Sequence, residues 1–185
     1  MTAGGCHYPT KAQTKQSNTH NMSKKRKMRF LIPALLFGVC VLTTGCNKNV
    51  FYTAQRDVDE AGWNMNDKVT FDVEIDDTLQ MYDFFVDVRN SVHYPKANTF
   101  FFINTTFPDG SVAYDTLECP LADVEGHWYG RRTGRYVDSR YVFRRHVIFP
   151  RTGNYHFEVA HGMRDTNVVG LKSVGLHIVK FGGKQ

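Results

Sequence analysis

The part of the chain after residue 66 alternates apolar and polar residues with a period of two, the pattern of β-strands that bury one face. Residues 69–76, 82–89 and 155–160 all show this alternation. Residues 99–107 are apolar on both faces, which predicts a strand in the middle of a sheet. These stretches predict a fold built from strands that each cover one side of a core.

Further strands and the turns between strands can also be located in the sequence. Residues 141–149 and 173–181 are apolar stretches that predict two more strands. Pro108-Asp109-Gly110 is strong turn chemistry, because proline presets φ and glycine accepts a positive φ, so residues 112–118 are predicted to return as the hairpin partner of 99–107. Gly153-Asn154-Tyr155 is typical of the tyrosine corner of β-sandwiches, in which the tyrosine hydroxyl holds the preceding turn.

No stretch has helical periodicity of convincing length. We therefore predict an all-β, antiparallel β-sandwich of about seven to eight strands over residues 67–185. A domain of this size buries about two-thirds of its unfolded surface, enough to fold without disulfides. Residues 46–66 are polar and lack a period, so we expect them to form a tether, with Trp63 docking its end on the domain.

The first 45 residues have the parts of a secretory signal. Residues 24–29 are basic, and residues 30–42 form an apolar run of 13 residues, too short to span a bilayer. Small residues then stand directly before Cys46, which resembles the lipobox of lipoprotein signal peptidase, although Thr43 replaces the usual leucine. We predict cleavage between Gly45 and Cys46 and attachment of acyl chains such as palmitate to Cys46; the alternatives are an ordinary signal peptide or an uncleaved anchor.

The start of the signal is predicted at Met22 or Met28, which gives it an ordinary length, and residues 1–21 receive no function. The leader also explains the basic isoelectric point. Seven of the 23 Lys and Arg residues and none of the 18 Asp and Glu residues lie in residues 1–45, so the remaining 16 basic and 18 acidic residues give the mature part a net charge of −2. The overall charge of +5 is therefore no argument for nucleic-acid binding.

The mature part shows no pattern for catalysis, a metal or a cofactor. His156 and Glu158 share one strand face, and Asp72, Glu74 and Asp76 share another. Both sets are typical of solvent-exposed strand faces that bind no metal. Neither a nucleophile elbow nor a phosphate loop is present in the sequence. Cys119 is the one cysteine left after Cys46, and we expect it to be a buried, inert thiol.

Residues 127–136 are the strongest candidate for binding a partner. Aromatic residues and arginines are enriched at interface hot spots, and the glycines of this stretch predict a mobile loop. The candidate residues are Trp128, Tyr129, Arg131, Arg132 and Arg135. Residues 131–151 hold seven arginines and one acid, whereas residues 57–87 hold ten acids and one lysine, so the two regions either pair with each other or leave a basic surface for an acidic partner.

Several short segments together resemble one family. They are Asp115-Thr116-Leu117-Glu118, Leu121-Ala122-Asp123, Glu125-Gly126-His127-Trp128-Tyr129-Gly130, Phe149-Pro150-Arg151-Thr152-Gly153-Asn154-Tyr155, Met163-Arg164-Asp165, Gly170-Leu171 and Val174-Gly175-Leu176. With the lipidated start, the chain resembles the GldH family, gliding-motility lipoproteins of Bacteroidota, over most of residues 46–185. The order and spacing of the segments carry the resemblance, because no one motif is specific.

The resemblance implies an outer-membrane lipoprotein without catalytic activity that serves gliding and the type IX secretion machinery, and it does not imply that the host glides. Asn47-Lys48-Asn49 lacks the acidic pair associated with surface export, which favours the periplasmic leaflet. The expected partners are the membrane and envelope proteins, not nucleic acid.

The alternative is a lipid-anchored glycan-binding β-sandwich module, with Trp63, Phe85, Trp128 and Tyr129 as candidate sugar-stacking residues. An aromatic platform on one face would favour this alternative, and a buried Trp128 would count against it. An envelope hydrolase ranks last, because it needs a cleft with convergent acids.

Overall fold

The computed structural model describes residues 49–182, and the predicted signal segment, Gly45 and Cys46 lie outside them. The all-β prediction is confirmed: these residues form eleven strands and no helix. None of the described residues belongs to a helix that is long and apolar enough to cross a bilayer. The strands are β1 (Val50–Asp57), β2 (Trp63–Asn64), β3 (Val69–Ile75), β4 (Met81–Ser91), β5 (Asn98–Thr106), β6 (Val112–Pro120), β7 (Arg131–Thr133), β8 (Tyr136–Ile148), β9 (Gly153–His161), β10 (Asn167–Val168) and β11 (Leu171–Lys180).

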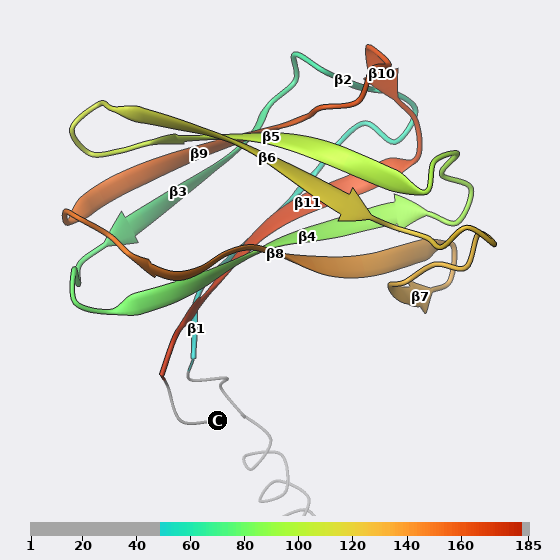
Figure 1. Cartoon of the computed structure of the whole chain (residues 1–185). Coiled ribbons are helices and arrows are strands. Elements are labelled where there is room, and N and C mark those ends of the chain that lie inside the picture. The colour runs from blue at the N-terminus through green and yellow to red at the C-terminus, as the bar shows by residue number, and fades with distance from the viewer. Residues whose placement is uncertain (1–48, 183–185) are drawn as a thin grey trace, which may run out of the picture. The chain divides into compact units, whose positions relative to one another are not determined.

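Two antiparallel sheets make the sandwich (Figure 1). One has the order β1-β11-β4-β8-β7 and the other the order β3-β9-β5-β6, while β2 and β10 pair by themselves at one end. Eight of the strands have seven or more residues, in agreement with the expected number, and β2, β7 and β10 are short. The strand predicted to be central, β5, lies between β9 and β6, and its hairpin with β6 is also as predicted.

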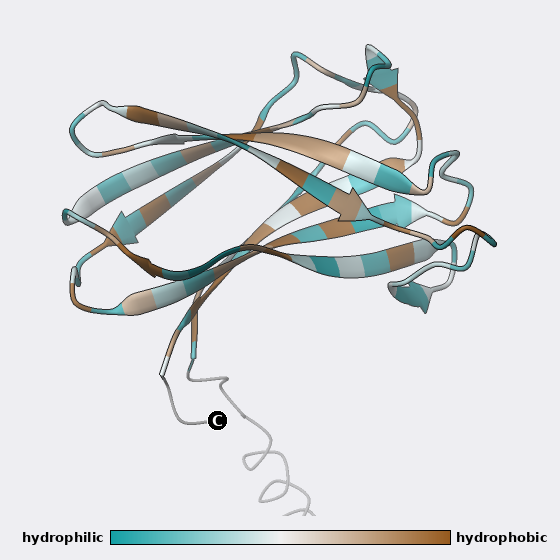
Figure 2. Ribbon diagram, in the orientation of Figure 1, coloured by the Kyte–Doolittle hydropathy of each residue, from teal (hydrophilic) through white to brown (hydrophobic). Residues whose placement is uncertain are grey.

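The core follows the period of two in each strand. Figure 2 shows apolar and polar positions alternating along the strands of both sheets. Tyr82, Phe84, Val86 and Val88 of β4 are all buried, and their side chains meet the buried positions of the opposite sheet. At about 25 cal/mol per Å² of apolar surface removed from water, this shared inner layer is the main stabilising contribution.

The first strand corrects the predicted tether. Residues 46–66 were expected to be irregular, but Val50–Asp57 forms β1, an edge strand paired with β11 from Val50↔Val179 to Asp57↔Ser173. A register shift after Val50 breaks its alternation, and the outward positions of an edge strand are polar, so the sequence pattern was weak. Trp63 does dock as predicted: its side chain is buried, and its indole N–H donates to the carbonyl of Asp67 at 2.6 Å.

The predicted turns are present. The amide of Phe107 donates to the carbonyl of Ser111 at 2.8 Å, and Gly110 has a φ of 83°, which an L side chain rarely adopts. The hydroxyl of Tyr155 donates to the carbonyl of Arg151 at 2.8 Å, which is the predicted tyrosine corner.

Two buried histidines were not singled out by the sequence. His161 packs edge-on against Trp63 with ring centroids 5.3 Å apart, and neither of its nitrogens makes a hydrogen bond of ordinary geometry. Desolvation lowers the pKa of His161, and the backbone groups of Trp63 and Thr166 oppose this only in part. The pKa of His177 is lowered by desolvation and then by the charge of Arg140. The fold therefore holds both side chains neutral.

These histidines predict a pH dependence of stability. Above the ordinary histidine pKa of 6.5 both states carry neutral imidazoles, so stability is fully present. As the pH falls below that value the unfolded chain binds protons first, and stability is lost until the pH passes the lower pKa of the folded state. We expect the urea-unfolding free energy to fall from about pH 7.5 to about pH 5, by about 1.4 kcal/mol for each unit by which folding lowers a pKa. His161→Leu should flatten this slope, and an unaltered slope in His161→Leu would contradict the assignment.

Candidate partner-binding surface

The stretch predicted to be a mobile loop is an ordered hairpin. Arg131, Arg132 and Thr133 form β7 and pair with the start of β8, and Gly134-Arg135 makes the two-residue turn. Gly134 has a φ of 62°, as the first position of such a turn requires. The pairing makes residues 131–133 the fifth strand of a sheet, so the prediction of a loop at these residues was wrong. We call residues 129–136 the arginine hairpin.

Gly130 allows the hairpin to approach the sheet. A Cβ atom at this position would lie 2.1 Å from the Ser139 hydroxyl oxygen and 2.5 Å from the carbonyl oxygen of Asp138. Neither distance is possible for real atoms, and the second involves backbone that cannot move aside cheaply. Gly130 was expected to add flexibility, but its role is to allow close packing.

The two aromatic candidates behave differently. Trp128 is half-buried, forms an isolated bridge with Ala122 and packs against the core. Tyr129 is 64% exposed, and its backbone amide donates to the carbonyl of Leu121 at 2.9 Å. Trp128 therefore supports the loop, and Tyr129 is the aromatic ring available to a partner.

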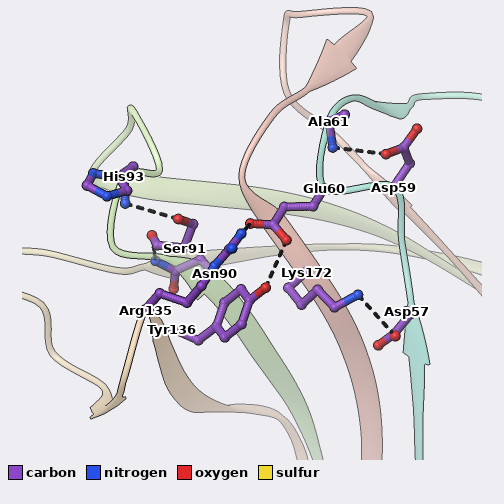
Figure 3. Close-up of polar contacts among 10 residues, drawn as sticks. All are labelled: Asp57, Asp59, Glu60, Ala61, Asn90, Ser91, His93, Arg135, Tyr136 and Lys172. Carbon is purple, nitrogen blue, oxygen red and sulfur yellow. Dashed lines mark hydrogen bonds and ion pairs between the residues drawn. The ribbon is translucent and has the colours of Figure 1, made fainter.

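Arg135 is exposed but is paired with Glu60, in the connection between β1 and β2. Its guanidinium donates to one carboxylate oxygen of Glu60 at 2.6 Å, and the hydroxyl of Tyr136 donates to the other at 2.9 Å (Figure 3). The bonds from Arg135 and then from Tyr136 lower the pKa of Glu60. The carbonyl of Arg135 also accepts a bond from the amide of Val92. All three arginines are exposed, but only Arg135 pairs with an acid, and this pair fixes the turn.

The basic region, residues 131–151, pairs only in part with the acidic region, residues 57–87. Four of the seven arginines in residues 131–151 form ion pairs with acids, and two of those acids lie in residues 57–87. The pairs are Arg135–Glu60, Arg140–Asp87, Arg144–Asp115 and Arg151–Asp109. Among residues 49–182, no acidic side chain forms an ion pair with Arg131, Arg132 or Arg145. Of these three arginines, Arg131 and Arg132 are neighbours on β7, whereas Arg145 lies near the end of β8.

Among the other side chains considered for catalysis or metal binding, Cys119 is buried, and His156 and Glu158 contact neighbouring charged side chains. Cys119 is buried, and desolvation raises its pKa to about 12, so the thiol is not a nucleophile at neutral pH. The ring of His156 contacts the Asp72 carboxylate at 2.8 Å, and Lys68 contacts Glu158 at 2.9 Å, as expected of exposed strand faces.

One possible metal-ligand group was missed by the sequence analysis. Asp123, Glu125 and His127 bring ligand atoms within 4.8 Å of one another in the connection from β6 to β7. Their alternate spacing in the sequence was the available signal. The amide of His127 donates to Asp123 at 2.7 Å, and its ring nitrogen contacts the other carboxylate oxygen at 3.1 Å. These bonds, the amide bond foremost, lower the pKa of Asp123, so the geometry is explained without an ion.

The four candidate sugar-stacking residues do not form one platform. Trp63 is buried in the core, Trp128 is half-buried, and Phe85 lies under the guanidinium of Arg140 with its ring near His177. Exposed aromatic rings occur instead on the outer face of the four-stranded sheet. There Phe102 and Tyr114 are diagonal neighbours on β5 and β6, beside a hollow of about 350 Å³.

Comparison with known proteins gives a consistent result. The sequence model described as GldH lipoprotein matches residues 50–178. The chain is 29% identical over 147 residues to a gliding motility lipoprotein GldH homolog of Christiangramia forsetii, covering 76% of this chain and 90% of that protein. It is 26% identical over 158 residues to the gliding motility lipoprotein GldH of Flavobacterium johnsoniae, covering 82% of this chain and 98% of that one.

A solved structure, dimeric latent PorU from Porphyromonas gingivalis, matches with a TM-score of 0.33 and 7% identity. The match covers 71% of this chain and 13% of the PorU chain. Likeness at this level supports no conclusion about function.

The close approach at Gly130 generates a testable prediction. Gly130→Ala should lower the free energy of unfolding by about 1–3 kcal/mol, because the added methyl group overlaps Ser139 and the backbone of Asp138. Urea unfolding followed by circular dichroism measures the change. Gly62→Ala is the matched control, since its Cβ would meet the nearest atom at an ordinary 3.5 Å. Equal stability of the two variants would show that the hairpin does not lie as close to β8 as described.

Proposed function

Because the chain belongs to the GldH family of gliding-motility lipoproteins, we propose that it is a lipid-anchored, non-enzymatic accessory subunit of an envelope machine for gliding and type IX secretion. In this proposal residues 1–45 are removed, Cys46 carries the acyl chains, and the domain stands in the periplasm on the outer membrane. The proposal assigns partner binding to the arginine hairpin, with Tyr129, Arg131 and Arg132 as the contact residues.

The exposed pair Arg131 and Arg132 on a fixed strand is the observation that carries the docking assignment. Arginine is enriched at interface hot spots, and a side chain on a rigid element loses less entropy on binding than one on a mobile loop. Arg135 and Tyr136, bonded to Glu60, hold the turn in place. A surface that keeps charges unpaired on a rigid support suits an acidic partner protein.

Phe102 and Tyr114 favour the alternative of glycan binding. Their rings are exposed on one sheet face beside a hollow that also contains Asn104 and Thr116, which offer hydrogen bonds to sugar hydroxyls. A glycan-binding module would use this face and not the arginine hairpin. The two functions therefore assign binding to different surfaces of the same domain.

Lipidation is tested by Cys46→Ala in the full chain. The variant should leave the membrane fraction, because acyl chains contribute about 0.8 kcal/mol per buried CH₂ and more than one chain is needed for stable anchoring. Cys40→Ala, which changes a cysteine in the apolar run, should remain with the membrane. Membrane fractionation and mass spectrometry of the N-terminal peptide measure the outcome, and a Cys46→Ala protein that stays fully membrane-bound would contradict the assignment.

Docking is tested by affinity purification from detergent-solubilised envelope with the native lipoprotein tagged at Gln185. Arg131→Ala with Arg132→Ala should lose most of the co-purifying secretion or motility proteins. Arg164→Ala, another exposed arginine without an ion pair among the described residues, should retain them. Trp128 is left unchanged, because it packs against the core. Retention by all three proteins would remove the hairpin as the site, and capture of glycan without protein would favour the alternative.

A further inference from the structure

β1 begins and β11 ends side by side (Figure 1), and four exposed apolar residues belong to the strand ends and the turn in this part of the domain. Leu79 at the β3–β4 turn is 89% exposed, Ile148 is 50%, Phe181 is 46% and Met81 is 39%. We call these four residues the anchor-end patch. Single exposed apolar residues are common, but several at one place mark a surface that is covered in use.

Backbone pairing and hydrogen bonds bring the four residues to the same end of the five-stranded sheet. Met81 pairs with Ile148 across β4 and β8. The amide of Phe181 donates to the carbonyl of Met81 at 2.8 Å, which joins the end of β11 to the start of β4. The side chain of Gln80 donates to the carbonyls of both Met81 and Phe181, at 2.7 and 2.9 Å, and so ties the turn that holds Leu79 to the same place.

A bulge in β8 shapes this surface. The pairing passes from Tyr82↔Val147 to Phe84↔Arg144, so Arg145 and His146 stand opposite one residue. His146 has a φ of 54°, the one positive value among the described non-glycine residues, and its amide donates to Asp83 at 2.8 Å. Its ring packs edge-on against Phe181, with centroids 4.1 Å apart. Strained backbone persists where the surrounding structure holds it, and here it supports an exposed aromatic ring.

The predicted acylation site, Cys46, is three residues before Asn49, and Asn49 lies next to the end of β11. The amide of Lys180 donates to the carbonyl of Asn49 at 2.9 Å, so Asn49 lies beside the residue that precedes Phe181. Three peptide steps separate Asn49 from Cys46, and an extended chain spans at most about 3.3–3.6 Å per residue, or about 11 Å in all. A lipid on Cys46 therefore keeps this end of the domain near the membrane surface.

We propose that the anchor-end patch is a lipid-contact surface that rests on the bilayer carrying the anchor, an inference that depends on the proposed acylation of Cys46. Its apolar side chains enter the boundary between headgroups and acyl chains, while Lys180 and Arg145 beside them suit lipid phosphates. The Asp77 carboxylate accepts the amides of Leu79 and Gln80 and so fixes the turn that carries Leu79.

The test places an environment-sensitive fluorophore at Leu79→Cys in the full lipoprotein, reconstituted in vesicles of phosphatidylethanolamine and phosphatidylglycerol. Cys119 is buried and Cys46 is acylated, so the new thiol is the one that reacts. Val124→Cys is the matched control: Val124 is also apolar, is 98% exposed and lies in the β6–β7 connection at the other end of the strands. Lipids with a quencher on the acyl chain should quench the probe at residue 79 several-fold more than the probe at residue 124.

Equal, weak quenching at both positions would overturn the proposal. A probe at residue 79 that is shielded from water but not quenched by lipid would also overturn it and would indicate a protein contact at the patch. A probe at Phe181→Cys repeats the measurement from a second strand end. Flotation of the same samples separates this test from that of the anchor: a protein that fails to float refutes acylation, whereas one that floats with a water-exposed probe refutes only the lipid contact.

Discussion

The structure depends on burying the inner faces of two sheets against each other, because no covalent cross-link is available to the domain. Cys119 is the one cysteine of residues 49–182, and it is free and buried. Each long strand therefore has to present its alternate side chains to the same layer, and a shift by one residue would expose them all. Trp63, held by β2 and β10, closes one end of this layer beside Phe101 and His161.

Because only the inner faces of the sheets have to be apolar, their outer faces can carry different kinds of side chain. The outer face of the five-stranded sheet is covered by charged pairs such as Arg140–Asp87 and Arg89–Asp138, each with two hydrogen bonds. Exposed ion pairs contribute little stability, but two-point contacts fix the positions of the side chains. These arginines are engaged with acids, whereas Arg131 and Arg132 on the adjoining strand are not, which is why the proposed docking site is placed there.

Sequence reasoning succeeded where one local signal decided the outcome. The alternation of residues 69–76 predicted β3, and Pro108 and Gly110 predicted the β5–β6 turn. Gly153-Asn154-Tyr155 predicted the tyrosine corner. It failed where the deciding partner is distant. The strand character of Val50–Asp57 depends on β11, more than a hundred residues away, and its own pattern is broken by a bulge. Arg135 could not be separated from Arg131 and Arg132, because Glu60 lies 75 residues away from it in sequence. The close packing of Gly130 on Ser139 also has no local signature.

Strand β8 links the two proposed binding surfaces, since it begins in the arginine hairpin at Tyr136 and ends in the anchor-end patch at Ile148. Thirteen residues of strand, at about 3.3 Å each, separate the two by about 40 Å along the chain. A domain resting on the bilayer at one end of β8 would hold the hairpin well away from the headgroups. A rigid strand paired to β4 along its length then acts as a spacer, which a flexible tether of residues 46–66 could not do. In this proposal β1 serves function as well as stability: by joining the sheet at Val50, it shortens the chain between the proposed anchor at Cys46 and the domain to a few residues.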